Sequence, residues 1–98
     1  MKNLSEFSST IRMFAFLIKD GYSVSRAVEI LAQQSAGDIG KMFAKASSLL
    51  KTGTSTADAF ASAGFPKELC AIASVGEKSG YMAEALELYG TYLEKATT

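Results

Sequence analysis

The chain has 98 residues, of which 48% are hydrophobic and 20% charged, and its ten basic and ten acidic side chains cancel to a net charge of zero. This length suffices for one domain, and the even charge argues against broad capture of nucleic acid or of an anionic membrane surface. Histidine is absent, which removes the usual neutral-pH base, the Ser-His and Cys-His nucleophile pairs and nearly all transition-metal sites. The single cysteine, Cys70, permits no internal disulfide and fits a reducing compartment.

Apolar residues recur at helical spacing along the whole chain, and β-branched residues alternate over no useful length. The sequence therefore predicts an all-α fold, a compact antiparallel six-helix bundle formed by a single domain over residues 1–98. The first helix, residues 5–20, is expected to be the central one because its apolar stripe is wide. That stripe comprises Phe7, Ile11, Met13, Phe14, Phe16, Leu17 and Ile18.

The next two helices are marked by their end signals. Gly21 ends the first helix and Ser23 is the expected N-cap of the second. The inward residues of the second helix are Val24, Ala27, Val28, Leu31 and Ala32. Asp38 is the expected cap of the third helix, which Gly53 stops. The inward residues of this third helix are Ile39, Met42, Phe43, Ala46, Leu49 and Leu50.

Two shorter helices follow. Ser55 and Asp58 form a weak capping box for a fourth helix that ends before Gly64. Its expected inward residues are Ala57, Phe60 and Ala61. Pro66 suits the first turn of a fifth helix, which residues 76–80 are expected to end. This helix is expected to bury Leu69, Cys70, Ile72 and Ala73.

The sixth helix, residues 81–95, has two apolar lines. The line predicted to face the core contains Met82, Ala85, Leu86, Tyr89 and Leu93. The second line, Tyr81, Leu88 and Tyr92, points elsewhere. It is interpreted as a weak contact between copies, since tyrosine and leucine bury apolar area while the hydroxyls stay in water. The alternative is that this second line packs on the first helix.

One pattern occurs twice, 32 residues apart. Lys19-x-Gly21-x-Ser23-x-x-x-Ala27 is followed by Lys51-x-Gly53-x-Ser55-x-x-x-Ala59. A basic residue near a helix C-terminus, a glycine just beyond it and a serine at the next N-cap account for both occurrences. Shared turn chemistry is therefore favoured over a true internal repeat.

No constellation for catalysis, metal or cofactor binding emerges from the remaining motifs. Residues 76–80 contain Lys-Ser between glycines, but Glu77 stands beside the lysine of what would be a phosphate loop, where its carboxylate would repel phosphate. Glu84 and Glu87 share a helix face and are interpreted as solvated. Cys70 lies in an apolar stretch and is interpreted as a core residue. An enzyme, a cofactor and a nucleic-acid partner are therefore not expected.

Residues 76–80 remain as the candidate for contact with a partner. One interpretation is a helix cap with polar filler, in which Glu77 pairs internally with a residue such as Arg12 or Arg26. The other is a fixed, charged corner, comprising Glu77, Lys78 and Ser79, that is offered to another protein. In this second interpretation Gly76 allows a close approach of two helices.

The chain resembles the inner-membrane platform proteins of type II secretion and type IV pilus machines, the GspF and PilC family. The resemblance rests on three motifs, in the family's order: Phe14-x-x-Leu17-x-x-x-Gly21-x-x-Val24-x-x-Ala27-Val28, then Gly53-x-Ser55-x-x-x-Ala59-Phe60, then Phe65-Pro66 with Gly76-Glu77-x-Ser79-Gly80-x-Met82-x-x-x-Leu86. It covers roughly Phe7 to Leu93. Asp20 and Val24 depart from the family's usual residues and favour a divergent pilus-type member, such as the one that serves the toxin-coregulated pilus.

The resemblance implies a cytoplasmic helical domain at the inner membrane, excised from a longer protein whose membrane helices follow. Such a domain would connect a cytoplasmic assembly ATPase to pilin assembly, would catalyse nothing itself, and would act as part of an oligomer. The alternative that the residues leave open is a free-standing helical adaptor that binds a partner helix in a groove.

Overall fold

A computed structural model of the chain describes residues 4–96, and over this range it contains six α-helices and no strand. The helices are α1 (Leu4–Lys19), α2 (Val24–Gln34), α3 (Gly37–Lys51), α4 (Thr56–Ser62), α5 (Lys67–Ser79) and α6 (Met82–Ala96). This confirms the all-α bundle that the sequence predicts. Within the described range, no helix has both the length and the apolar character needed to span a membrane.

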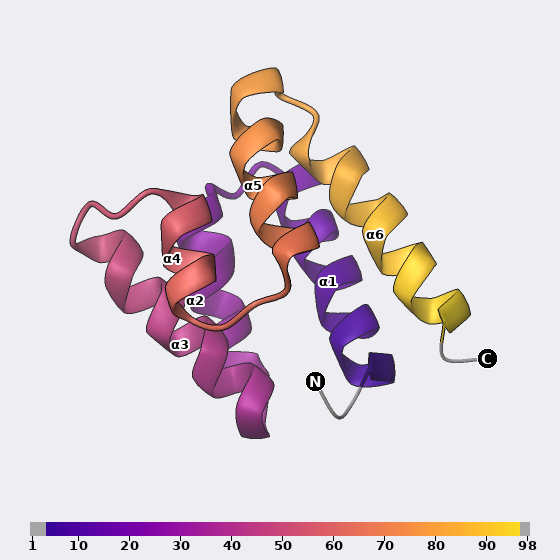
Figure 1. Ribbon diagram of the computed structural model, residues 1–98, viewed down its shortest axis with the longest axis horizontal. Coiled ribbons are helices and arrows are strands. Elements are labelled where there is room, and N and C mark those ends of the chain that lie inside the picture. The colour runs from indigo at the N-terminus through magenta and orange to yellow at the C-terminus, as the bar shows by residue number, and fades with distance from the viewer. Residues whose placement is uncertain (1–3, 97–98) are drawn as a thin grey trace.

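The six helices form two groups of three that share one core (Figure 1). In one group α1 and α6 run antiparallel, and α5 precedes α6 in a second antiparallel pair. In the other group α2 and α3 pack together, with the short α4 beside α3. Contacts between α4 and α5 and between α1 and α2 join the groups.

Aromatic rings connect the two groups through the centre of the molecule. Phe14 of α1 makes edge contacts with Phe43 of α3 at 6.2 Å between ring centroids and with Phe60 of α4 at 6.0 Å. Phe65 lies 4.7 Å from Phe43 by the same measure, and 6.2 Å from Phe7 of α1. Phe7, Phe14, Phe43 and Phe60 are fully buried, so the core is continuous across the bundle.

The packing of α1 on α6 is close because α6 carries a glycine at the contact. The hydroxyl of Ser8 donates a hydrogen bond of 2.9 Å to the carbonyl oxygen of Gly90. A Cβ at Gly90 would lie 2.5 Å from Cγ of Arg12, so a larger residue would require the Arg12 side chain or the helices to shift.

The two occurrences of the repeated pattern form the same turn. Gly21 and Gly53 have φ of +103° and +92°, and the residue after each donates its N–H to a carbonyl five residues back, Tyr22 to Leu17 and Thr54 to Leu49. This is the Schellman arrangement that ends a helix at a left-handed glycine. Ser23 and Ser55 then cap the next helices by accepting the N–H groups of Arg26 and Asp58. Shared turn chemistry therefore explains the pattern.

Several expected positions are wrong. Met13 and Phe16 were assigned to the core of α1, but they are 43% and 60% exposed, because the buried stripe of this helix is narrower than its run of apolar residues. Ala61 is exposed, and Ala59 is buried instead. Asp38 is not the cap of α3: the helix begins one residue earlier, and Ala36 at the N-cap supplies no side-chain hydrogen bond.

Candidate partner-binding surface

The segment of residues 76–80 is the last turn of α5 and its end, rather than a loop between helices. The helix continues to Ser79, and Gly80 follows with φ of +81°. Gly76 is buried, and a Cβ at this position would lie 2.9 Å from the Cα of Met82. As the sequence suggests, Gly76 is what lets α5 and α6 approach so closely.

Ser79 serves the turn itself. Its hydroxyl lies 3.4 Å from the carbonyl oxygen of Gly76, to which it donates, and accepts the N–H of Tyr81 at 3.2 Å. The N–H of Gly80 also donates to the carbonyl of Gly76, at 3.0 Å. These bonds satisfy backbone groups at the end of α5 and fix the path into α6.

Glu77 and Lys78 project from the end of α5 into solvent. Neither arginine suggested as an internal partner of Glu77 reaches it: Arg12 pairs with Glu94, and Arg26 pairs with Glu29. Across the part of the chain that the structure describes, neither Glu77 nor Lys78 forms a salt bridge. The two charges are thus available to another molecule.

A groove of about 510 Å³ opens beside Glu77, where the turn between α5 and α6 meets the turn between α1 and α2. Lys19 and Tyr22 line it from the α1 side, and Glu84 lines it from the first turn of α6. The groove was not expected from the sequence, because its walls come from turns about 55 residues apart that only the tertiary fold brings together.

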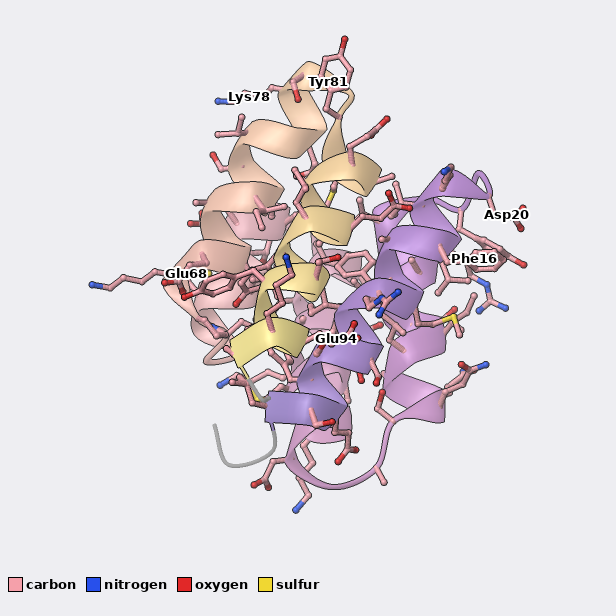
Figure 2. All side chains as sticks on the ribbon, turned by 90° about the vertical axis from the view of Figure 1, so that its right-hand side faces the viewer. Phe16, Asp20, Glu68, Lys78, Tyr81 and Glu94 are labelled. Carbon is pink, nitrogen blue, oxygen red and sulfur yellow. The ribbon has the colours of Figure 1, made fainter. Side chains whose placement is uncertain are left out.

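Tyr81, Leu88 and Tyr92 lie on the outer surface, 67%, 73% and 66% exposed. The alternative that they pack on the first helix is therefore wrong. Figure 2 shows Tyr81 projecting beside Lys78 at one end of the α5–α6 pair, with Glu68 toward the other end of α5. Val75 of α5 is also exposed, at 66%. Sequence pattern does not distinguish Val75, because it follows an apolar stretch that mostly faces inward.

A second groove, of about 780 Å³, follows the contact of α1 with α6. Met13 and Phe16 line it on the α1 side and Glu87 and Thr91 on the α6 side. Lys19 reaches across one end, with its Nζ 3.9 Å from a carboxylate oxygen of Glu87. The two apolar side chains wrongly assigned to the core are thus the apolar part of a surface groove.

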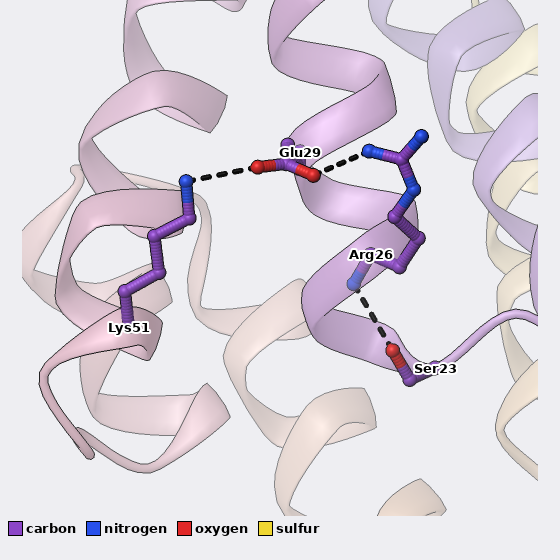
Figure 3. A network of polar contacts seen from close by, with 4 residues as sticks. All are labelled: Ser23, Arg26, Glu29 and Lys51. Carbon is purple, nitrogen blue, oxygen red and sulfur yellow. Dashed lines mark hydrogen bonds and ion pairs between the residues drawn. The ribbon is translucent and has the colours of Figure 1, made fainter.

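A polar network joins α2 to α3 on the far side of the bundle (Figure 3). Glu29 accepts from Arg26 on its own helix and from Nζ of Lys51, at 2.9 Å, at the end of α3. The hydrogen bond from Lys51, and after it the one from Arg26, holds the pKa of Glu29 below its usual 4.5. This network links α2 to α3 at the surface of the bundle.

The remaining titratable groups of interest are Cys70, which is half-buried against the core, and Tyr89, which is buried in it. Burial raises the pKa of the Cys70 thiol, whose Sγ lies 3.9 Å from the carbonyl oxygen of Phe65, as befits a packed and unreactive thiol. Burial, and secondarily the carboxylate of Glu68, raises the pKa of Tyr89 to about 12. Among residues 4–96, no three His, Cys, Asp or Glu side chains gather as metal ligands would.

Comparison of the chain with models of known protein families identifies its family. Residues 10–97 match the family model described as "Type II secretion system (T2SS), protein F", a span that includes most of α1 and the whole of α2 to α6. Comparison with curated proteins finds no match. The family match favours a part in secretion or pilus machinery over a free-standing adaptor. The chain belongs to the family of protein F of the type II secretion system.

Proposed function

We propose that this chain is a non-catalytic platform domain of a type IV pilus or type II secretion assembly machine. In this role it lies on the cytoplasmic face of the bacterial inner membrane and is part of a longer membrane protein. It passes the movements of a cytoplasmic assembly ATPase to the pilin subunits. The family match over residues 10–97 carries this proposal. The departures at Asp20 and Val24 favour a pilus-type member, such as that of the toxin-coregulated pilus.

The end of α5 suits the contact with the ATPase. Transmission of a movement requires a surface that does not yield, and Gly76 packs against the backbone of Met82 while Ser79 fixes the turn. Glu77 and Lys78 then offer two opposite charges side by side, exposed and without salt bridges to residues 4–96. Opposite charges held on a rigid turn can orient a partner that carries the complementary pair.

Replacement of Glu77 by glutamine tests this contact. Because the side chain is exposed and unpaired, we expect the melting temperature of Glu77→Gln to stay within about 4 °C of the unsubstituted chain, as surface substitutions away from structural features change stability by under about 0.5 kcal/mol. Pilus assembly or secretion in cells is expected to fall. Glu68→Gln, an equally conservative change near the start of α5, is the control and should leave assembly unchanged. Full assembly with Glu77→Gln would refute the contact.

We also propose that Tyr81, Leu88 and Tyr92 take part in a contact between copies of the chain. Each is at least 66% exposed, and large apolar groups exposed together on one helix commonly mark an interaction surface. Leu88 and Tyr92, four residues apart, share one side of α6, and Tyr81 directly precedes the first residue of that helix. This contact is separate from Glu77 and Lys78, although Tyr81 borders both surfaces (Figure 2).

A further inference from the structure

Two helices of opposite net charge lie toward opposite ends of the longest axis of the molecule. Helix α3 carries three lysines and one aspartate, a net charge of +2, and α6 carries three glutamates and one lysine, a net charge of −2. Figure 1 places them on opposite sides of the bundle, whose longest extent is 38 Å. Each buries its inner side against the core, so their exposed sides face away from each other.

The exposed side of α6 is both apolar and acidic. Glu84 precedes Leu88 by four residues and Tyr92 by eight, so these three residues lie on one side of α6, and the exposed Tyr81 stands directly before the first residue of the helix. We call these four residues the α6 stripe. Glu84 is exposed and makes no salt bridge with any residue that the structure describes. The stripe thus presents large rings and one unpaired carboxylate.

The exposed side of α3 has the complementary features. Lys41 and Lys45, one turn apart, flank Ala44 and precede Ser48 by seven and three residues, and all four are exposed. We call these four residues the α3 face. Lys51 is already engaged by Glu29 at 2.9 Å, but neither Lys41 nor Lys45 forms a salt bridge within residues 4–96. Small side chains between two lysines leave room for large ones from a partner.

We propose that the α6 stripe of one copy binds the α3 face of a second copy. The tyrosine rings accept the lysine ammonium groups over their faces, and the lysine stems cover Leu88. Glu84 supplies the opposite charge. This inference rests on the proposed contact between copies, and it names the surface of the second copy that the stripe meets.

Pairing of unlike surfaces determines the form of the assembly. A symmetric dimer through α6 would set rings against rings and offer Glu84 no free cation, since Lys95 on the same side of α6 already interacts within the chain, whereas a stripe on a lysine face satisfies both sides. Such a contact is heterologous, so each copy keeps one free stripe or one free face, and copies add head to tail into a ring or a chain. The charges are exposed, so the association weakens as salt rises from about 0.05 M to about 0.5 M.

The test uses two variants of the 98-residue chain, each blocked on one surface. Tyr81→Ser, Leu88→Ser and Tyr92→Ser together remove the stripe, and Lys41→Glu with Lys45→Glu reverses the face. Sedimentation velocity over a concentration series at low salt should show the unsubstituted chain growing beyond a dimer and each blocked variant remaining a monomer. An equimolar mixture of the two should form a dimer and stop there, since one intact stripe meets one intact face.

Three controls separate the possible failures. Circular-dichroism melting shows whether each blocked variant is folded, and the dimer in the mixture itself requires both to be folded. Lys67→Glu, which reverses an exposed charge on α5, should associate like the unsubstituted chain. Monomers in the mixture, growth of the Lys41→Glu/Lys45→Glu variant, or an unsubstituted chain that never associates would each overturn the proposal. Assembly in cells with Glu77→Gln reports on the proposed function independently of these results.

Discussion

At the scale of single residues, the stability of the bundle depends most on a few aromatic side chains that several elements share. Phe43 is fully buried and touches rings from α1 and from the segment between α4 and α5, through Phe14 and Phe65. A ring at such a crossing fills space that no single helix could fill. Its removal therefore loosens contacts between elements rather than within one.

Replacement of Phe43 by alanine should lower the free energy of unfolding by about 3–5 kcal/mol, the cost of lost burial together with the cavity left behind. Denaturant titration measures this loss. Phe16→Ala is the matched control, because Phe16 is 60% exposed on the neighbouring helix, and it should cost under about 1 kcal/mol. Equal losses in the two variants would contradict the burial assigned to Phe43.

The ion pairs of Glu29 should give the bundle a measurable dependence on acid. Its pKa is lower in the folded chain than the usual 4.5, so the folded state holds this proton less tightly than the unfolded state does. The resulting stabilisation is present above the unfolded pKa and is lost as the pH falls through the folded pKa. Glu29→Gln should therefore unfold more easily than the unsubstituted chain at neutral pH, and the difference should vanish once the pH lies below the folded pKa of Glu29. Urea titrations at several pH values measure this, and a difference that persists in acid would refute it.

At the scale of elements, the positions of the helices could be predicted from sequence because the signals are local. The turns at Gly21 and Gly53 and the caps at Ser23 and Ser55 each depend on a few adjacent residues. The width of a buried face is not local. Phe16 and Ala61 were misassigned because an apolar side chain next to a buried one is exposed wherever no neighbouring element covers it, and that depends on the crossing of helices.

The candidate surface also has features that local sequence predicts and features that only the tertiary fold creates. The outward direction of Leu88 follows from helical spacing, and the exposure of Glu77 follows from its charge. Neither the groove beside Glu77 nor the pairing of Arg12 with Glu94 could be predicted, since each joins α1 to residues from the C-terminal half of the chain. Pairings at such sequence separation are determined by packing and leave no pattern in the local sequence.

At the contact of α5 with α6, we expect replacement of a glycine by alanine to lower the stability of the chain, whereas helix propensity alone predicts an increase. Alanine in place of glycine inside a helix normally stabilises it by about 0.5–1 kcal/mol. At Gly76, however, the added Cβ would lie 2.9 Å from the Cα of Met82, a backbone atom that cannot turn aside. Gly76→Ala should therefore destabilise the chain by about 1–3 kcal/mol, measured by thermal or denaturant unfolding. Ser74→Ala, on the exposed side of α5, is the control and should be nearly neutral; a stabilising Gly76→Ala would refute the close approach.

At the scale of the whole molecule, the two groups of three helices share a core although few elements connect them. The buried cluster takes residues from all six helices, and the contribution of the short α4 is Phe60. Phe7 extends the line of rings toward α6 through an edge contact with Tyr89, at 6.2 Å between centroids. Neither group could bury these rings alone, because each ring is shielded from solvent partly by residues of the other group.

The bundle should consequently unfold as one unit. If α2, α3 and α4 separated from the rest, Phe14, Phe43 and Phe60 would all be exposed, and fully burying a phenylalanine side chain is worth about 1.5–3 kcal/mol. That cost is comparable to much of the stability expected of a small domain, so a partly unfolded state should not be populated. Native-state hydrogen exchange measures this directly: the slowest amides of α1, α3 and α6 should exchange with one common free energy, equal to that of global unfolding in urea. The common value should be unchanged by a metal chelator. Slowest amides in α3 that exchange at a clearly lower free energy than those in α1 and α6 would show that the two groups are separate folding units, and that the rings between them contribute less than their burial implies.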